Sequence, residues 1–349
     1  MFNRIVLGFA LLTLERLNPL NVEPASAQTP FYQGKTITLV VGSTTGGGYD
    51  LWARLLARHL GKHIPGNPTI LVQNMPGAAS IVAANYLSTV AKPDGLTLGA
   101  LLPAIYFDQL VGRKEVKFDF AKIPWIGSPE QNDIVHYMRA DSPYKSLDDI
   151  RKAKEPPRCG SSGTGTTGFY IPRLLDEVFG TKHTIVSGYQ GGSEIDLAIE
   201  RGEVHCWSPL VATYFGREPY ISWHKKGFVR VLLQTNRKRD ERLKDVPTIY
   251  ELMDQFKTGD AGRRLTNVIL TAATLGRPVA APPGISAERL KLLREAYLKT
   301  LKDPELVAET KKQRWDIDPL SGEEMEKLAK EVMTQPKEVI EKMKWVLGN

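Results

Sequence analysis

Short apolar runs alternate with amphipathic stretches along most of this chain. In the first half the pattern predicts strands at 36–42, 69–73 and 96–102 and helices at 49–60 and 81–90. In the second half it predicts strands at 134–138, 157–160, 184–187, 204–207 and 229–234 and helices at 146–154, 167–179 and 193–201. Strands that alternate with helices in this way indicate an α/β fold, with parallel sheets and crossover helices.

The last part of the chain is predicted to be mostly helical. Apolar residues three and four apart predict helices at 286–301, 304–314 and 322–347, and we expect these to pack back on the first part of the fold. A turn before residue 248 leads into a further helix, with Thr248 as its cap and Glu251 placed to complete a capping box.

Two segments share one order of features, a strand, a glycine-rich loop and a helix. They read VVGSTTGGGYDLWAR at 40–54 and RCGSSGTGTTGFYIPRLL at 158–175. Such a loop exposes backbone N–H groups at the positive end of a helix dipole, which attracts an anion. Because one loop lies in each half, we expect two α/β lobes that face each other across an anion-binding cleft.

Residues 1–27 have the features of an export signal. Arg4 precedes an apolar run at 5–14, and Ala25-Ser26-Ala27 fits a cleavage site before Gln28. About ten apolar residues cannot span a bilayer, which needs about 20. No cysteine lies near this cut. We therefore predict a soluble periplasmic protein that is exported and carries no lipid anchor.

The length and net charge of the chain restrict how many domains it can form and which ligands it can bind. A chain of 349 residues suits two domains better than one. The net charge of +7 agrees with an anionic ligand, although basic residues on solvated helix faces explain it equally well. No basic stripe is interleaved with aromatic residues, which argues against nucleic acid. We expect a monomer, in which Cys159 and Cys206 form either one disulfide or two buried thiols.

The second loop contains a literal dinucleotide fingerprint, Gly163-x-Gly165-x-x-Gly168, with Asp196 further along. Three features argue against nucleotide binding. The match lies inside a longer run of Gly, Ser and Thr, additional residues separate it from the strand, and an exported protein has no ready nicotinamide pool. The first loop lacks the lysine of phosphate-binding loops. We therefore predict no cofactor.

The usual catalytic and metal-binding motifs are missing from the sequence. It contains no His-Glu-x-x-His, Gly-x-Ser-x-Gly or Cys-x-x-Cys, and its six histidines do not cluster at metal-ligand spacing. His205, beside Cys206, fits a buried structural histidine better than a catalytic one. We predict that the protein is not an enzyme and has no metal site.

Seven segments, taken in order and including parts of the two glycine-rich loops, resemble one known family. They are GGGYDLWAR (46–54), VQNMPGAAS (72–80), KPDGLTLG (92–99), GSSGTGTTG (160–168), GYQGGSEIDLAIERGEV (188–204), DVPTIYE (245–251) and APPGIS (281–286). The chain resembles, over essentially its whole mature length, the Bug family of periplasmic substrate-binding proteins of tripartite tricarboxylate transporters. It departs from the usual family pattern at Thr45, at Ala79-Ser80 and at His205, which leaves the identity of the ligand open.

The resemblance implies a two-lobed periplasmic-binding-protein fold, with each lobe a mostly parallel sheet flanked by helices and two crossover segments between them. Domain 1 would comprise 28–130 and 266–349, and domain 2 would comprise 131–265. The lobes would close on a small organic carboxylate and deliver it to a membrane permease. Carried onto this chain, the ligand-binding residues are Gly46, Gly47, Gly48, Tyr49, Asp50, Pro76, Gly77, Ala78, Ser161, Ser162, Thr164, Gly165, Thr166, Thr167, Tyr189, Gln190, Gly191, Gly192 and Asp196.

Two questions about this site stay open at the level of sequence. Asp50 fits a support for the loop N–H groups better than a ligand contact, because a carboxylate ligand would repel it. Aromatic residues near the cleft would suit an aromatic acid or simply core packing, and the acid could carry one, two or three carboxylates; these residues are Tyr49, Phe169, Tyr170, Tyr189 and Trp207. The alternatives to transport are a ligand-sensing receptor and an exported enzyme that uses the same cleft.

Overall fold

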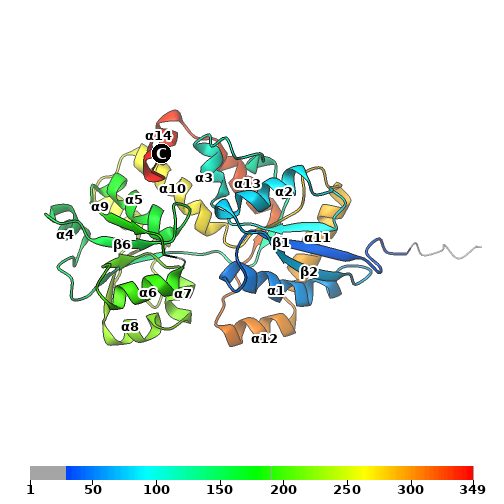
Figure 1. Cartoon of the computed structure of the whole chain (residues 1–349), viewed down its shortest axis with the longest axis horizontal. Coiled ribbons are helices and arrows are strands. Elements are labelled where there is room, and N and C mark those ends of the chain that lie inside the picture. Colours follow the sequence, from blue (N-terminus) through cyan, green and yellow to red (C-terminus); the bar gives the residue numbers. More distant parts are fainter. Residues whose placement is uncertain (1–28, 190, 349) are drawn as a thin grey trace, which may run out of the picture.

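The protein has two lobes, each built around its own sheet (Figure 1). The computed structural model describes residues 29–189 and 191–348, so the predicted export signal lies outside the described residues. The first sheet has the order β11-β4-β10-β3-β1-β2, with β1 Thr36–Val41, β2 Thr69–Asn74, β3 Thr97–Ala100, β4 Trp125–Ser128, β10 Val279–Ala280 and β11 Leu320–Ser321. The second has the order β7-β6-β8-β5-β9, with β5 Val135–Arg139, β6 Arg158–Ser161, β7 Thr184–Ser187, β8 Cys206–Trp207 and β9 Val229–Gln234.

Both sheets contain parallel and antiparallel pairs. β1 pairs in parallel with β2 and β3, and β6 pairs in parallel with β7 and β8. β10 runs antiparallel to β3 and β4, β11 to β4, and β5 to β8 and β9. The predicted two-lobed α/β fold is confirmed. β5 follows the passage of the chain into the second lobe and β10 follows its return, and each of these two strands is antiparallel to both of its neighbours in the sheet.

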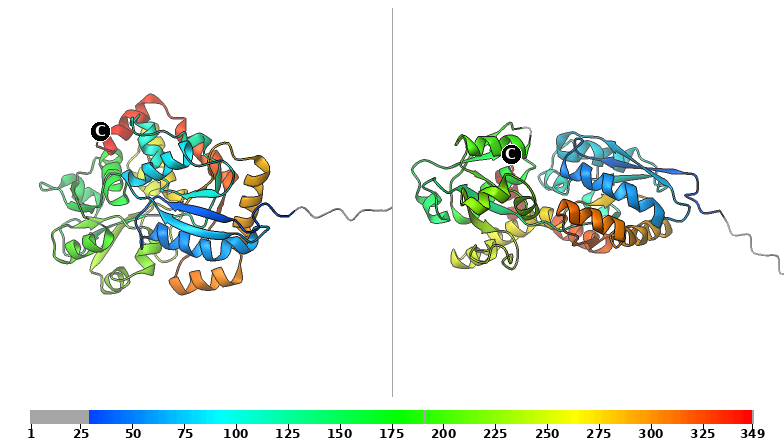
Figure 2. Two further views of the ribbon diagram at one scale, coloured as in Figure 1. Left: turned by 45° about the vertical axis from the view of Figure 1, so that its right-hand side comes forward. Right: turned by 90° about the horizontal axis from the view of Figure 1, so that it is seen from below.

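Helices cover the sheets of both lobes (Figures 1 and 2). Around the first sheet they are α1 Gly48–Leu60, α2 Ile81–Thr89, α3 Ile105–Leu110, α11 Ala287–Thr300, α12 Pro304–Gln313 and α13 Gly322–Met333. Around the second sheet they are α4 Leu147–Lys152, α5 Thr167–Phe179, α6 Gly192–Glu200, α7 Val211–Gly216, α8 Tyr220–Lys226, α9 Ile249–Gln255 and α10 Asp260–Thr274. α11 and α13 contact β4, whereas the last helix, α14 Lys337–Val346, contacts α5 and α10.

Two predictions about helix ends have opposite outcomes. The single helix predicted at 322–347 is wrong, because α13 ends at Met333 and α14 begins at Lys337. Pro336 separates them, and a proline inside a helix removes a hydrogen bond and clashes with the preceding turn. The capping box is confirmed: the Glu251 N–H donates to Thr248 Oγ1 at 3.1 Å, and the Thr248 N–H donates to Glu251 Oε2 at 2.7 Å.

One apolar core continues from lobe to lobe. The rings of Phe107 in α3 and Tyr170 in α5 meet edge to face with centroids 5.5 Å apart, and both belong to the same buried cluster. The Tyr106 hydroxyl donates to the backbone carbonyl of Val268 in α10. The lobes therefore share packed side chains on this side of the molecule, and the exact domain boundaries stay a prediction.

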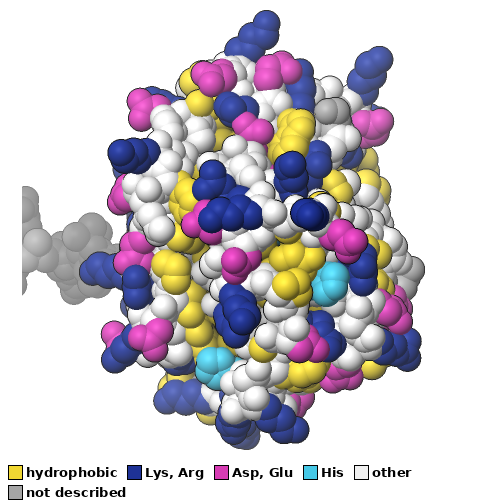
Figure 3. All heavy atoms as spheres, turned by 90° about the vertical axis from the view of Figure 1, so that its left-hand side faces the viewer, with side chains coloured by type: hydrophobic (Ala, Val, Ile, Leu, Met, Phe, Trp, Pro, Cys, Tyr) yellow, Lys and Arg dark blue, Asp and Glu magenta, His cyan; other side chains and the backbone are white. Residues whose placement is uncertain are grey.

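The outer face of the second lobe has no single-sign patch. In Figure 3, Lys and Arg side chains are interspersed with Asp and Glu. Within 29–189 and 191–348, no helix is long and apolar enough to cross a membrane.

Candidate functional site

The two lobes contact each other through their loops. A Cβ added at Gly165, in the second glycine-rich loop, would lie 3.1 Å from Cβ of Ala79 in the first lobe. Beside this contact lies a cavity of about 390 Å³. It is lined by Ala78, Ala79, Ile81, Leu102, Ala104, Phe107, Asp108, Arg113, Glu115, Val116, Ser162, Gly163, Thr164, Gly165, Thr166 and Leu347. Residues predicted from both halves of the sequence therefore meet at one cavity.

The first glycine-rich loop connects β1 to the N-terminus of α1. Gly46 has φ +83°, a backbone conformation that residues other than glycine rarely adopt. This turn directs the chain into the helix. The N–H groups of Gly48, Tyr49 and Asp50 lie in the first helical turn, where they have no carbonyl of their own helix to bind. The structure therefore places backbone donors and the positive end of the α1 dipole where the loop was predicted to hold an anion.

Asp50 is buried beside this loop, and both oxygens of its carboxylate accept hydrogen bonds. Its Oδ2 accepts from the Gly46 N–H at 2.8 Å and from Arg54 Nε at 2.9 Å, and its Oδ1 accepts from Asn74 Nδ2 at 2.9 Å. Burial alone would raise the pKa of Asp50, but these hydrogen bonds outweigh it and lower the pKa. The Gly46 N–H is therefore used inside the loop, and Asp50 is a positioning residue for the donors that follow it.

Asp50→Asn should lower the free energy of unfolding by about 1 to 3 kcal/mol at pH 7, because an amide cannot accept from all three donors. The pKa of Asp50 is depressed in the folded state, so its contribution is complete above the unfolded pKa of about 4 and is lost as the pH falls through the lower folded value. Urea titrations at pH 7 and pH 3 should thus show a smaller difference between the two proteins in acid.

Asp254→Asn is the matched control, because Asp254 is exposed and forms only a surface ion pair with Arg263. It should change stability by less than about 1 kcal/mol. An equal cost for both variants, or a cost at Asp50 that does not depend on pH, would contradict the role assigned to Asp50.

Arg277 lies directly against the start of α1. A Cβ added at Gly48 would be 2.7 Å from Arg277 Nη1 and 3.1 Å from Nη2, and the guanidinium carbon lies 4.9 Å from the centre of the Tyr49 ring. Arg277 Nε donates to Glu130 Oε1 at 2.5 Å, and the two side chains are only 15% and 5% exposed. Within the described part of the chain, neither Nη of Arg277 has a hydrogen-bond partner.

This arrangement is electrostatically unusual, because a cation lies at the positive end of a helix. Glu130 fixes the guanidinium through Nε and leaves the two Nη groups side by side, the geometry that binds a carboxylate with two parallel hydrogen bonds. The Tyr49 hydroxyl donates to the Gly276 carbonyl at 3.3 Å. Burial, partly offset by Arg277, raises the pKa of Tyr49 to about 12, so its hydroxyl stays neutral.

The second loop uses its own hydroxyls to hold its shape. Ser161 Oγ accepts from the Gly163 N–H at 3.1 Å, and Thr166 Oγ1 donates to the Gly163 carbonyl at 2.7 Å. α5 then begins at Thr167, so its first N–H groups face outward from the loop. Ser161 and Thr166 therefore stabilise the loop, and Thr166 lines the cavity together with Ser162 and Thr164.

Trp207 lies beneath the starts of α5 and α6. A Cβ at Gly168 would be 2.7 Å from its Nε1, and a Cβ at Gly192 would be 2.8 Å from its ring. Gly191 caps α6 at this point. The indole therefore leaves no room for a side chain at Gly168 or Gly192, the glycines at the two helix starts.

Asp196 is buried, and both of its carboxylate oxygens accept hydrogen bonds from side chains of the second lobe. Arg217 Nη2 donates to its Oδ2 at 2.7 Å, and the Tyr220 hydroxyl donates to Oδ1. Burial raises the pKa of Asp196, although Tyr220 and Arg217 partly offset this. Arg217 also lies 3.5 Å from the position of a Cβ at Gly192, so a second guanidinium lies near a helix start.

Of the residues that the structure describes, the others that were predicted to bind the ligand do not line the cavity. Pro76 and Gly77 precede the lining residue Ala78 without lining the cavity, and Tyr189 packs on an apolar cluster of the second lobe. Gln190 lies outside the described residues. The sequence prediction missed Arg277 and Arg217. For Arg277, the available signal was the basic residue in Gly276-Arg277-Pro278, placed where the chain returns to the first sheet.

The comparisons with known proteins agree on one family and one fold. The family described as tripartite tricarboxylate transporter family receptor matches residues 52–345. The UPF0065 protein of the gbd 5' region of Cupriavidus necator is 28% identical over 328 residues, which cover 92% of this chain and 91% of that protein. A UPF0065 protein of Bordetella bronchiseptica is 24% identical over 309 residues, which cover 87% and 84%.

Solved structures of the same fold include two with bound acids. A TctC solute-binding protein from Polaromonas, without ligand, has a TM-score of 0.64 at 19% identity and covers 86% of this chain and 96% of its own. MatC from Rhodopseudomonas palustris with bound malate gives 0.63 at 19%, covering 89% and 99%. Another R. palustris protein, solved with adipate, gives 0.64 at 22%, covering 90% and 97%. At these identities the likeness establishes the fold.

Proposed function

The chain belongs to the tripartite tricarboxylate transporter receptor family, and on this premise we propose that it captures a small organic carboxylate between its lobes for delivery to a membrane permease. The family and the fold are those of solute-binding receptors and not of enzymes. The permease is proposed from the family alone. The same family supports the periplasm as the place where the protein acts.

The observation that carries the proposal is the pair of Arg277 Nη groups at the start of α1. Both are side by side over Gly48, without a hydrogen-bond partner in the described part of the chain, and the helix dipole adds positive potential at the same point. A carboxylate there would accept from the guanidinium and from N–H groups of the first turn. Malate and adipate, bound by proteins of the same fold, belong to this chemical class.

The cavity beside the loops favours a ligand with an apolar portion. Its wall includes the apolar residues Ile81, Leu102, Phe107 and Val116. Its polar lining comprises Ser162, Thr164 and Thr166 of the second loop and Asp108, Arg113 and Glu115 of the first lobe. A volume of about 390 Å³ lies within the range of small-molecule sites. Neither Arg277 nor residues 46–50 line this cavity. The proposed ligand is an organic acid whose charged end binds at α1 and whose carbon chain extends from there toward the second loop.

Thermal-shift measurements with mono-, di- and tricarboxylates and aromatic acids test this function. A ligand at about 100 times its Kd should stabilise the folded protein by about 2.7 kcal/mol, a clear rise in Tm. The amide of the best acid is the matched control and should give a much smaller shift, because it lacks the negative charge. A shift with a nucleotide and with none of the acids would show that the proposed function is wrong.

A further inference from the structure

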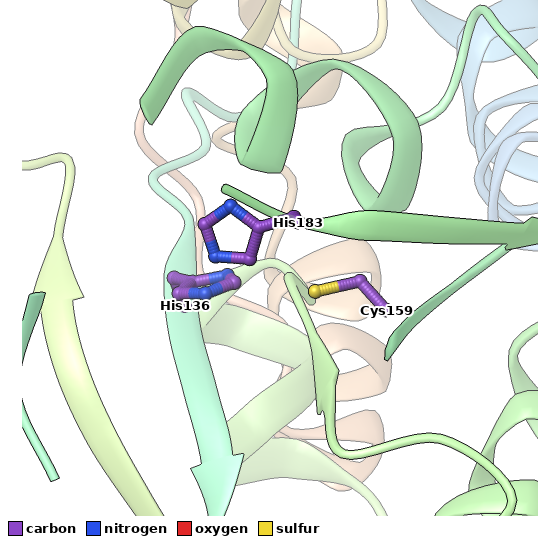
Figure 4. A group of neighbouring side chains, drawn as sticks. All are labelled: His136, Cys159 and His183. Atoms are coloured by element: carbon purple, nitrogen blue, oxygen red, sulfur yellow. The ribbon is translucent and has the colours of Figure 1, made fainter. Parts of the chain in front are cut away.

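A buried group of sulfur and imidazole donors lies in the second lobe, separate from the residues that line the cleft cavity. One ring nitrogen each of His136 and His183 and the Sγ of Cys159 lie within 4.8 Å of one another (Figure 4). Cys159 is joined to Cys206 by a disulfide, so a second sulfur is adjacent. His136, Cys159 and Cys206 are fully buried, and so is the side chain of His183.

Strand register brings the four side chains to one face of the second sheet. Cys206 in β8 pairs with Cys159 in β6 and with Met138 in β5, and His136 lies two residues before Met138. Cys159 also pairs with Ile185 in β7, and His183 lies two residues before that. Because alternate residues of a strand share a face, all four donors point toward the same layer. Figure 4 shows the Cys159 sulfur directed at the two rings.

Both histidines have one ring nitrogen occupied and the other without a partner. Nδ1 of His183 lies 2.5 Å from Asp176 Oδ1, and Nδ1 of His136 lies 2.9 Å from Ser208 Oγ. The Nε2 atoms of both rings are buried and have no hydrogen-bond partner among the residues that the structure describes. When Nδ1–H donates to Asp176, Nε2 carries the lone pair, which is the carboxylate–histidine arrangement that prepares a metal ligand.

We propose that Cys159, Cys206, His136 and His183 form a buried Zn²⁺ site when the disulfide is reduced. Two thiolates and two neutral imidazoles are a usual tetrahedral ligand set for this ion. The charges of two thiolates cancel those of Zn²⁺, so the assembled site is neutral, as burial requires.

Formation of the site replaces the disulfide bond by two metal-bound thiolates. A small dithiol transfers two electrons and two protons to the Cys159–Cys206 bond, which breaks to give two thiols while the reagent becomes a cyclic disulfide. Zn²⁺ then binds both sulfurs and releases the two thiol protons to water. With Zn–S bonds of about 2.3 Å the sulfurs must move to about 3.8 Å apart, which rotation about the side-chain bonds of two cysteines on neighbouring strands can provide.

The edge of the sheet offers a route for the ion. β7 is the terminal strand of the second sheet, and His183 immediately precedes it, between the exposed residues Lys182 and Thr184. An ion entering here would meet His183 first and the more central donors afterwards.

Titration of the full-length protein with Co²⁺, followed by competition with Zn²⁺, tests the site directly. After reduction with a dithiol and removal of the reagent, the folded protein should bind one Co²⁺ per chain with a thiolate-to-cobalt charge-transfer band. Zn²⁺ should abolish this band. The oxidised protein, identical in sequence, should give no such band. A reduced and folded protein that shows no band, or the same band when unfolded in urea with unchanged affinity, would overturn the proposal.

Substitutions test which side chains bind the metal ion. His136→Gln and His183→Gln should weaken Co²⁺ binding at least 10-fold, and Asp176→Asn should weaken it 10- to 100-fold by releasing the His183 ring. His205→Gln is the matched control: His205 adjoins Cys206 but is not among the grouped donors, and its Nδ1 accepts from the Arg158 N–H at 3.1 Å. Equal losses at His205 and at the proposed ligands would refute the assignment. If His136→Gln or His183→Gln does not fold, Asp176→Asn and the comparison of reduced with oxidised protein still test whether the metal site exists.

Discussion

Arg277→Gln should lower the affinity for the proposed acid ligand by about 2 kcal/mol or more, roughly 30-fold at least, because a carboxylate bound at α1 would lose two parallel hydrogen bonds from the guanidinium. Isothermal titration with the acid identified by thermal shift measures this loss. Arg277→Lys should give an intermediate affinity, since an ammonium keeps the charge but not the two parallel donors. The amide of the same acid should bind both proteins equally weakly.

The substitution also leaves Glu130 buried without its partner, so stability must be separated from binding. Arg277→Gln combined with Glu130→Gln removes both charges and should recover most of the thermal stability without recovering affinity. Arg289→Gln is the control elsewhere in the first lobe, where Arg289 donates to the Asp94 carbonyl, and it should leave affinity unchanged. If folded Arg277→Gln binds the acid within threefold of the unchanged protein, Arg277 is not part of the site.

Gly165→Leu should abolish ligand binding while the protein stays folded. A Cβ at this position already lies 3.1 Å from Ala79 Cβ, so a larger side chain would hold the two loops apart. The backbone of Gly165 is not in the left-handed region, so leucine adds no backbone strain there. X-ray scattering with and without the acid should show that the unchanged protein becomes more compact and that the variant does not.

Gly259→Leu is the matched control for Gly165→Leu. A Cβ at Gly259, at the start of α10, meets nothing within 4 Å. This variant should bind the acid with unchanged affinity and close as before. If Gly165→Leu binds normally as well, the contact between the second loop and Ala79 has no part in closing the site.

The long, periodic elements of this protein could be predicted from its sequence. The helix at 167–179 and the strands at 184–187 and 229–234 have the predicted bounds, because each is long or regular enough to show its own apolar pattern. β10 and β11 have two residues each and no periodicity of their own. They are strands only because their neighbours in the first sheet supply the hydrogen bonds.

The parts of the site that escaped prediction depend on contacts between distant segments. Arg277 reaches the start of α1 only because the chain returns from the second lobe at that point. The histidines at 136 and 183 have no metal-ligand spacing, and the prediction that the protein has no metal site relied on spacing. Sheet register, which the apolar pattern does not specify between strands this far apart, brings them to the same two cysteines.

The order of strands in the first sheet has a consequence for the order in which the protein can assemble. β10 lies between β3 and β4, yet every strand of the second sheet precedes β10 in the chain. During synthesis, the sheet of the first lobe therefore stays incomplete between β3 and β4 until the whole second lobe has been made. The second sheet, formed from one continuous segment, can fold at once. For this chain the lobe that begins first is finished last, and its unpaired strand edges at β3 and β4 are the surfaces that a chaperone would need to protect.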